Sequence, residues 1–192
     1  MKHNLGLYLK IFKSYINKIQ YFDYNELYIY IIVIRIYEFS ILCKSSLLFK
    51  INSLVDLGAI DWIWRIHRFS VYYNFYSFFY NYRVLVILDV PVFFSYLYGL
   101  GIESLSKLFN SANWLERETW DLFGVYFFHH ADLRRILTDY GFTGFPFRKD
   151  FPISGYKELR YDDTYKIIVS EKIKLMQEYR VFHFINPWGV DL

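Results

Sequence analysis

Three runs of β-branched and aromatic residues in the middle of the chain constrain its fold more than any other feature. They cover residues 54–62, 66–79 and 82–90, and Pro91 follows the third run. Such residues fit the pleated surface of a strand, and little more than the corner at Tyr80 and Asn81 separates the last two runs. Because so short a connection favours an antiparallel hairpin, the sequence predicts an antiparallel sheet here.

The residues before these runs predict two helices and a further strand. Residues 27–36 are typical of a buried strand, and residues 40–51 have weaker helical spacing. Helix, strand, helix and three strands predict an α+β domain of two layers with a mixed, mostly antiparallel sheet. The first helix could lie on a membrane, but packing on its own sheet is the commoner use. Its apolar positions are Leu5, Leu9, Phe12, Ile16 and Ile19.

Length and composition predict a chain that buries a core and still exposes aromatic side chains. Of its 192 residues, 55% are hydrophobic and 23% aromatic, which suits one domain with an appended tail. The aromatics exceed the need of one small core, so we expect a partner to cover some of them. The uncharged runs are too short for a membrane span, so we expect no transmembrane helix. A net charge of +3 is too small to indicate a nucleic-acid binder.

The single cysteine, Cys43, excludes an intramolecular disulfide and offers no ligand set for an iron–sulfur cluster or a structural zinc. We expect it to be a buried, inert thiol. The N-terminus has the pattern of neither a signal peptide nor a good transit peptide. The scarcity of alanine beside 20 Tyr and 20 Phe is typical of an AT-rich genome, so we expect an organelle-encoded chain.

A stretch from 114 to 163 gathers charged residues, glycines and prolines. Its first part predicts a helix with Asn113 as N-cap, Glu116 in a capping box and Gly124 as terminator. On that helix Arg117 and Asp121 have the spacing of an ion pair. A short helix is also predicted just before it, at residues 103–109.

A second helix is predicted to begin at Asp132, which would cap it, and to end at Gly141. Arg134 and Arg135 would point away from its apolar stripe. That stripe consists of Leu133, Ile136, Leu137 and Tyr140.

Residues 142–192 predict an extended C-terminal tail with little core of its own, following an α+β domain at residues 1–141. Glycines and prolines make residues 145–152 a rigid, extended segment that displays Arg148, Lys149 and Asp150. Short strands are predicted at 156–161 and 165–169. We expect partner subunits to order this tail, because it cannot bury its own aromatics.

Three chemical interpretations of the charged stretch compete with a structural one. Glu118 and Asp121 could form an acid–base pair, but the interleaved Arg117 favours an ion pair. His129 and His130 diverge, so they make a poor metal site even with Asp132. A basic cluster could bind RNA phosphates, but the acidic residues threaded through it favour a protein interface of mixed charge. That cluster comprises Arg134, Arg135, Arg148, Lys149 and Arg160.

The ordered blocks WLERETWDLFG, DLRRILTDYGF, RKDFP and ELRYDD resemble the signature region of the NuoC-type, or 30 kDa, subunit of respiratory complex I. Phe145 and Ala131 stand where this family usually has His and Pro. The residues that carry the resemblance, and that it implies are interface residues, are Trp114, Glu116, Arg117, Glu118, Asp121, Gly124, Asp132, Arg134, Arg135, Arg148, Lys149 and Asp150.

The resemblance implies a non-catalytic subunit of proton-pumping NADH:ubiquinone oxidoreductase, in the quinone module of the peripheral arm on the matrix side of the mitochondrial inner membrane. Its expected partners are the large quinone-module subunit and the subunit with the terminal iron–sulfur cluster. The chain itself is expected to bind no cofactor, whereas the complex would contain FMN, iron–sulfur clusters and ubiquinone. Alternatives are the equivalent subunit of a bacterial or plastid enzyme, or an organellar RNA-binding or ribosomal protein.

Overall fold

The computed structural model describes residues 16–23, 26–47, 49–90 and 101–182. It divides into a first unit, Met1–Phe151, and a second unit, Pro152–Leu192. The second unit therefore begins at Pro152, the last residue of the RKDFP segment, whereas the predicted tail begins at residue 142. The two units are described separately.

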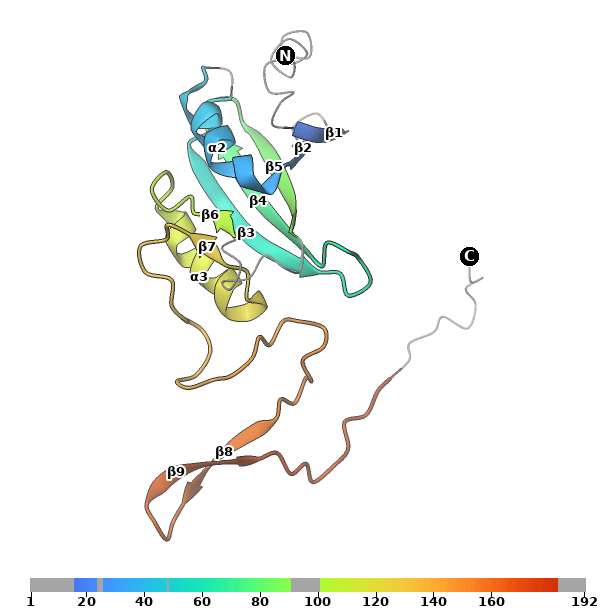
Figure 1. Ribbon diagram of the computed structural model, residues 1–192, viewed down its shortest axis with the longest axis vertical. Coiled ribbons are helices and arrows are strands. Elements are labelled where there is room, and N and C mark those ends of the chain that lie inside the picture. The colour runs from blue at the N-terminus through green and yellow to red at the C-terminus, as the bar shows by residue number, and fades with distance from the viewer. Residues whose placement is uncertain (1–15, 24–25, 48, 91–100, 183–192) are drawn as a thin grey trace, which may run out of the picture. The chain divides into compact units, whose positions relative to one another are not determined.

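A five-stranded sheet forms the centre of the first unit (Figure 1). Its strands are β1 (Ile16–Asp23), β2 (Glu26–Ile31), β3 (Ser53–Asp61), β4 (Phe69–Ser77) and β5 (Tyr82–Val90), in the order β1-β2-β5-β4-β3. The β2–β5 pair is parallel and the other pairs are antiparallel. The predicted α+β class with a mixed, mostly antiparallel sheet is therefore confirmed.

In the part of the chain that the structure describes, two α-helices accompany the sheet. They are α2 (Ile36–Ser45), preceded by the 3-10 turn η2 (Val33–Arg35), and α3 (Ser111–Phe123). Two short parallel strands, β6 (Ile102–Glu103) and β7 (Phe127–Phe128), flank α3 in the sequence. All these elements contribute to one buried cluster with the sheet. Among the described residues, no helix is both long enough and apolar enough to cross a bilayer.

Alternation along β4 decides which face of the sheet is buried. Val71, Tyr73 and Phe75 are almost completely buried, and the residues between them are half-buried. The Phe75 ring lies 5.5 Å from the Phe109 ring, which joins this face to the segment before α3. Cys43 of α2 is buried in the same core, as predicted, and burial raises the pKa of its thiol far above the ordinary value.

The strands predicted from residues 54–62, 66–79 and 82–90 are confirmed as β3, β4 and β5, and β4 and β5 form the predicted hairpin. Asn81 takes a positive φ of 51° in its turn, a conformation that Asn tolerates better than most residues.

Several predicted helices are wrong. Residues 16–19 belong to β1, which pairs with β2, and the rest of the predicted N-terminal helix lies outside the described residues. The strand predicted at 27–36 ends at Ile31, and the helix predicted at 40–51 runs earlier, from Ile36 to Ser45. Residues 103–109 form a strand end and turns instead of a helix. Antiparallel pairing with the next strand, β2, outweighs local helical spacing in β1.

The described part of the second unit, residues 152–182, contains an antiparallel hairpin of β8 (Lys157–Asp162) and β9 (Ile167–Lys172) (Figure 1). The two short strands predicted at 156–161 and 165–169 are therefore confirmed, with shifted ends. Lys166 adopts a positive φ of 53° in the turn between them.

Candidate functional site

The charged stretch begins on helix α3, and Gly124 ends that helix as predicted. Gly124 is left-handed, with a φ of 76°, and its N–H donates to the Trp120 carbonyl at 2.9 Å. A Cβ at this position would lie 2.7 Å from Phe145 Cζ and 2.5 Å from Arg148 Nη2. Glycine is therefore required both by the backbone conformation and by the close approach of Phe145 and Arg148.

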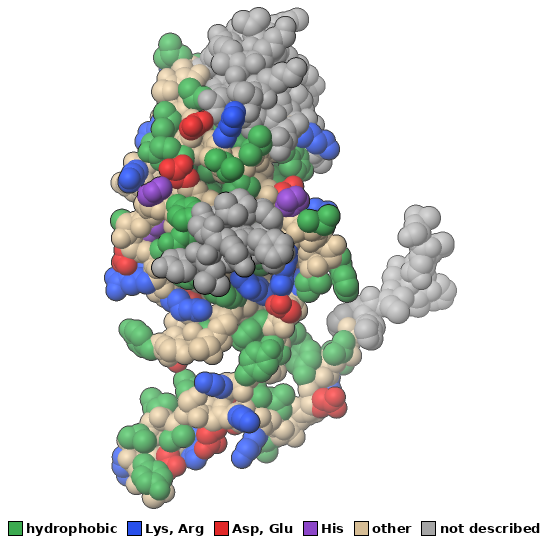
Figure 2. All heavy atoms as spheres, in the orientation of Figure 1, with side chains coloured by type: hydrophobic (Ala, Val, Ile, Leu, Met, Phe, Trp, Pro, Cys, Tyr) green, Lys and Arg blue, Asp and Glu red, His purple; other side chains and the backbone are tan. Residues whose placement is uncertain are grey.

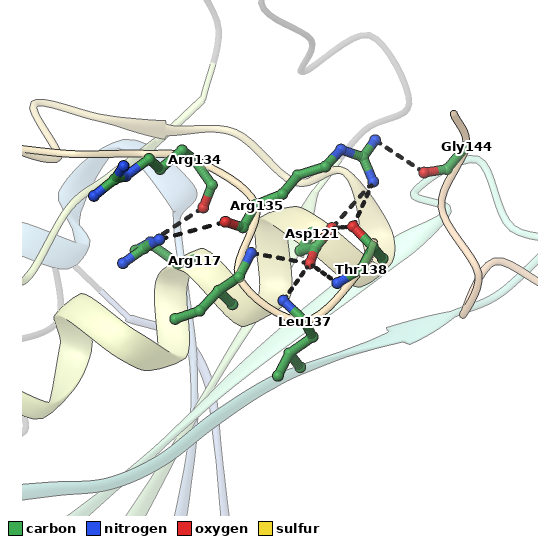
Figure 3. A network of polar contacts seen from close by, with 8 residues as sticks. Arg117, Asp121, Arg134, Arg135, Leu137, Thr138 and Gly144 are labelled. Atoms are coloured by element: carbon green, nitrogen blue, oxygen red, sulfur yellow. Dashed lines mark hydrogen bonds and ion pairs between the residues drawn. The ribbon is translucent and has the colours of Figure 1, made fainter. Parts of the chain in front are cut away.

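The carboxylate of Asp121, in the last turn of α3, is buried and holds a distant loop by hydrogen bonds (Figure 3). Its Oδ2 accepts from the backbone N–H groups of Ile136, Leu137 and Thr138 at 3.2, 2.8 and 2.8 Å. Its Oδ1 accepts from the Thr138 hydroxyl at 2.7 Å and from Arg135 Nη1 at 3.0 Å. One side chain of the helix thus fixes the path of the loop.

The environment of Asp121 keeps it ionised. Burial would raise the pKa of its carboxyl, but the hydrogen bonds from Thr138, Leu137 and Ile136 outweigh burial and hold the pKa below the usual range. A carboxylate with this many donors is a stable structural anion. Its oxygens are occupied, so it is a poor candidate for a catalytic acid or base with Glu118.

Two arginines tie the backbone around this carboxylate (Figure 3). Arg117 Nε donates to the Arg134 carbonyl at 3.1 Å, and its Nη2 donates to the Arg135 carbonyl at 3.4 Å. Arg135 Nη2 donates to the Gly144 carbonyl at 3.0 Å. The guanidinium of Arg135 also lies 5.2 Å from the centre of the Phe145 ring. These contacts fasten the loop after α3 at several points.

Arg148 closes the carbonyl end of α3. Its Nε donates to the Phe123 carbonyl at 2.7 Å, and the Phe147 N–H donates to the Leu122 carbonyl at 3.1 Å. The guanidinium lies 4.3 Å from the centre of the Phe145 ring. Carbonyls in the last turn of a helix have no partner within the helix, so Phe147 and Arg148 supply the missing donors.

Lys149 and Asp150 join this segment to the end of the sheet. Arg68 binds Asp61 through two hydrogen bonds, of 2.7 and 2.9 Å, and its Nη2 lies 3.0 Å from an oxygen of Asp150. The Lys149 N–H donates to Asp61 at 2.9 Å. Burial raises the pKa of Asp61, but the Arg68 and Lys149 hydrogen bonds and the charges of Arg68 and Arg148 outweigh it and lower the pKa below the usual range. The predicted extended segment is instead a series of turns, and its residues up to Phe151 belong to the first unit.

Glu116 points into the core, so the predicted capping box is wrong. Helix α3 begins at Ser111, which places Glu116 well inside the helix. Its carboxyl accepts from the Ser104 hydroxyl at 2.6 Å and from the Leu105 N–H at 2.7 Å. Burial raises the pKa of Glu116 to about 7, against the lowering effect of these two hydrogen bonds. Glu116 therefore ties α3 to the segment that follows β6.

A buried histidine lies beside this carboxyl. His130 Nε2 is 3.8 Å from Glu116, and both side chains are fully buried. His130 Nδ1 accepts from the Asp132 N–H at 3.1 Å, so Nε2 carries the proton that faces the Asn113 carbonyl at 3.3 Å. Burial has the largest influence on His130 and lowers the pKa of its imidazole, which favours the neutral ring.

Two further predictions for this stretch are wrong. Arg117 and Asp121 do not pair, since each binds the backbone of the later loop. Asp132 caps no helix, because residues 133–140 are irregular. The backbone N–H groups of residues 136–138 donate to Asp121 and not to carbonyls of a helix. Asp132 instead lies 2.8 Å from Arg134, and both are exposed.

The surface of this region is both apolar and charged. Trp114, Leu137, Tyr140 and Phe147 are exposed large side chains, and Lys149 and Asp150 are exposed nearby in the sequence. Within the described ranges, no three His, Cys, Asp or Glu side chains are grouped so that they could hold a metal ion. The use of this surface as an interface stays a prediction.

Sequence reasoning missed the residues that complete these networks, namely Asp61, Arg68, Ser104 and Thr138. The positions of Asp61 and Arg68 in the sequence could have revealed this pair. Asp61 and Arg68 stand at the two ends of the loop that joins β3 to β4, so antiparallel pairing brings them together. The partners of Glu116 and Asp121 had no local signal, because irregular segments supply them.

With this geometry established, comparison with known proteins identifies the family. The model of the family "Respiratory-chain NADH dehydrogenase, 30 Kd subunit" matches residues 35–157. This chain belongs to that family. The matched residues include strands β3, β4 and β5 and helix α3. They also include the arginine–aspartate networks around Asp121 and around Asp61. The resemblance seen in the signature blocks is therefore confirmed.

Relatives of the 30 kDa family extend the match over nearly the whole chain. NADH-ubiquinone oxidoreductase subunit 9 of Acanthamoeba castellanii is 44% identical over 183 residues, which cover 95% of this chain and 89% of that protein. NADH dehydrogenase (ubiquinone) iron-sulfur protein 3 of Arabidopsis thaliana is 48% identical over 154 residues, covering 79% and 78% respectively.

A solved structure shares the fold. It is a chain in the structure of the membrane-bound sulfane sulfur reductase, an archaeal respiratory membrane complex. That chain superposes with a TM-score of 0.64 at 20% identity, over 79% of this chain and 86% of its own length. At this identity the likeness concerns the fold alone.

Proposed function

We propose that this chain is a non-catalytic, peripheral-arm subunit of proton-pumping NADH:ubiquinone oxidoreductase. In this role it supports electron transfer from NADH to ubiquinone by assembling the large subunit of the quinone module. The observation that carries the proposal is the family match over residues 35–157, which contains every network described above. The relatives whose names specify ubiquinone support the choice of quinone.

The geometry of the charged residues supports a structural role. Asp121, Arg135, Arg148 and Asp61 are each engaged in hydrogen bonds that hold one segment against another. Groups held in this way have no freedom to exchange protons with a substrate. They build a rigid surface of mixed charge and exposed aromatic groups, which suits a protein partner.

The proposal includes no cofactor on this chain. An iron–sulfur cluster is commonly held by four cysteine thiolates, and this chain has one cysteine. Cys43 is buried in the core with a raised pKa, so its thiol is neither accessible nor ionised. The FMN, iron–sulfur clusters and ubiquinone of the complex would therefore lie on other subunits.

The residue composition, typical of an AT-rich organellar genome, supports a place in mitochondria. We assign the chain to the matrix side of the inner membrane, next to the large quinone-module subunit and the subunit with the terminal iron–sulfur cluster. An RNA-binding role is disfavoured, since Arg135, Arg148 and Arg160 already bind carbonyls or carboxylates.

The experiment is purification of a tagged full-length chain from organelle membranes in mild detergent, followed by quantitative mass spectrometry and cross-linking. We expect the large quinone-module subunit and the terminal-cluster subunit in amounts equal to the chain, with cross-links to both. Recovery of the chain alone, or with ribosomal proteins, would contradict the proposal.

A further inference from the structure

The β8–β9 hairpin of the second unit has two chemically different faces. In its register Leu159 pairs with Ser170, and Tyr161 pairs with Ile168. Directly opposed residues of an antiparallel pair point to the same side, and alternate residues along a strand do so as well. We call this side the apolar face; it comprises Lys157, Leu159, Tyr161, Ile168, Ser170 and Lys172.

The other side, the ion-pair face, is satisfied within the hairpin. Arg160 Nη2 lies 2.8 Å from a Glu171 oxygen and 3.3 Å from an Asp162 oxygen. These contacts leave Asp162 and Glu171 only half-exposed. The ion-pair face exposes a single large apolar side chain, Ile167 at 56%, and its paired charges can stand in water without a partner. Its residues are Glu158, Arg160, Asp162, Ile167, Val169 and Glu171.

The apolar face, in contrast, is uncovered. Leu159, Tyr161 and Ile168 expose 59, 58 and 69% of their surface. Figure 2 shows such hydrophobic side chains on the hairpin surface among charged ones, where Figure 1 labels β8 and β9. Two strands alone are marginally stable in water, and β8 and β9 form the only sheet among the described residues of the second unit. The hairpin therefore needs a surface that covers these three side chains.

Charge on the apolar face indicates what that surface carries. Lys157 and Lys172 oppose each other at the open end of the hairpin. Among the described residues neither ammonium group forms an ion pair, whereas Arg160 on the other face has two acidic partners. The two lysines lie beside Leu159 and Ser170 on one face, so one surface would meet both the charges and the apolar groups.

We propose that the apolar face docks on a neighbouring subunit of the complex, on a patch that is apolar at its centre and bears carboxylates where Lys157 and Lys172 lie. This inference rests on the proposed function. It assigns the contact to one face of one hairpin and leaves the ion-pair face towards solvent.

A matched pair of neighbouring isoleucines tests the assignment. Ile168 lies on the apolar face and Ile167 on the ion-pair face, and both are exposed. Ile168→Gln and Ile167→Gln make the same chemical change in the same strand, so their effects on strand propensity match. The measurement is the amount of full-length chain in the assembled complex on native gels. We expect at least a fivefold loss for Ile168→Gln and less than a twofold loss for Ile167→Gln. Equal losses, or no loss, would overturn the assignment.

A charge reversal separates docking from hairpin stability. Lys172→Glu places a carboxylate opposite Lys157, a cross-strand pair that favours the hairpin itself. We nevertheless expect a severalfold loss of docking, because the variant presents a negative charge to the carboxylates of the partner. Lys172→Arg, which keeps the charge, should dock as the wild type does. Normal assembly of Lys172→Glu would contradict the predicted chemistry of the partner.

Other occupants and a wrong function give different results. Cross-links from the apolar face to a second copy of this chain, or flotation of the chain with anionic vesicles that Ile168→Gln abolishes, would replace the proposed partner. If the wild-type chain is absent from the complex, the proposed function fails. If the wild-type and Ile168→Gln chains are equally present, the function stands and the face assignment fails.

Discussion

Asp121 and Asp132 both contact an arginine, but only the Asp121 carboxylate is buried. The asparagine of Asp121→Asn would remove the charge that faces Arg135 and would bring an amide towards backbone N–H donors. We expect the free energy of unfolding to fall by about 2–4 kcal/mol. Asp132→Asn changes an exposed ion pair and should cost less than about 1 kcal/mol. Urea unfolding of the purified chain measures both, and equal costs would show that the Asp121 network contributes little.

Glu116 gives the chain a pH dependence whose sign follows from its pKa. Burial raises that pKa from 4.5 to about 7, so the folded state binds the proton more tightly than the unfolded state. Its contribution to stability is therefore fully present below about pH 4.5 and is lost as the pH rises through 7.

Glu116→Gln should remove this loss. Between pH 5 and pH 8 the variant should gain about 2–3 kcal/mol of stability relative to the wild type. His130 has a lowered pKa and acts in the opposite direction, so His130→Gln serves as the companion variant. An unchanged pH profile in Glu116→Gln would mean that this carboxyl stays ionised in the fold.

At this scale the sequence singled out some members of the networks, such as Asp121 and Glu116, but neither their contacts nor their partners. The spacing of Arg117 and Asp121 suggested a pair within one helix, and Asn113 and Glu116 suggested a cap. Both carboxylates instead bind backbone groups well outside the helix. A loop that folds back onto a helix offers unpaired N–H groups, and no periodic pattern in the sequence reports where they lie.

At the scale of elements, the end of helix α3 depends on Gly124, which adopts a left-handed conformation and leaves room for neighbouring side chains. Gly124 and Gly141 have nearly the same φ, 76° and 71°, but only at Gly124 would a Cβ meet other atoms within 4 Å. Gly141→Ala should therefore cost about 1–2 kcal/mol from backbone strain alone. Gly124→Ala should cost about 1–3 kcal/mol more, because Phe145 and Arg148 must move. Thermal unfolding of both variants tests this, and equal costs would mean that Phe145 and Arg148 move aside without cost.

Strands β3, β4 and β5 could be predicted because their buried face alternates in the sequence, as at Val71, Tyr73 and Phe75. The helix predicted after Asp132 failed for the opposite reason. Leu137 and Tyr140 have helical spacing but are exposed, and the backbone N–H of Leu137 donates to the Asp121 carboxylate. One long-range carboxylate outweighed a local pattern.

At the scale of the whole molecule, the division after Phe151 changes where the chain can be cut. Residues 141–151 supply the Gly144 carbonyl, the Arg148 guanidinium and the Lys149 N–H to contacts within the first unit. A chain of residues 1–151 should therefore melt close to the full-length chain. A chain of residues 1–140 should melt about 6–12 °C lower, since it loses several such contacts. Circular dichroism melting decides this, and identical Tm values for the two fragments would show that the segment adds no stability.

The fold class and the family could be predicted from the sequence, because strand alternation and ordered signature blocks survive without knowledge of contacts. The face of the β8–β9 hairpin that needs a partner could not. Leu159 and Tyr161 alternate with charged residues, whereas Ile168 stands between Ile167 and Val169, and only the register of the two strands shows that the three share a side.

A structural role in the quinone module predicts that NADH:ubiquinone turnover follows the amount of assembled complex. In cells that carry only Asp121→Asn, we expect less assembled complex, while NADH:ubiquinone activity per assembled complex stays that of the wild type. The direct measurement is quinone-reductase activity in isolated membranes divided by the complex content from native gels. A normal amount of complex with a several-fold lower turnover would contradict this account, because the chain would then take part in the chemistry.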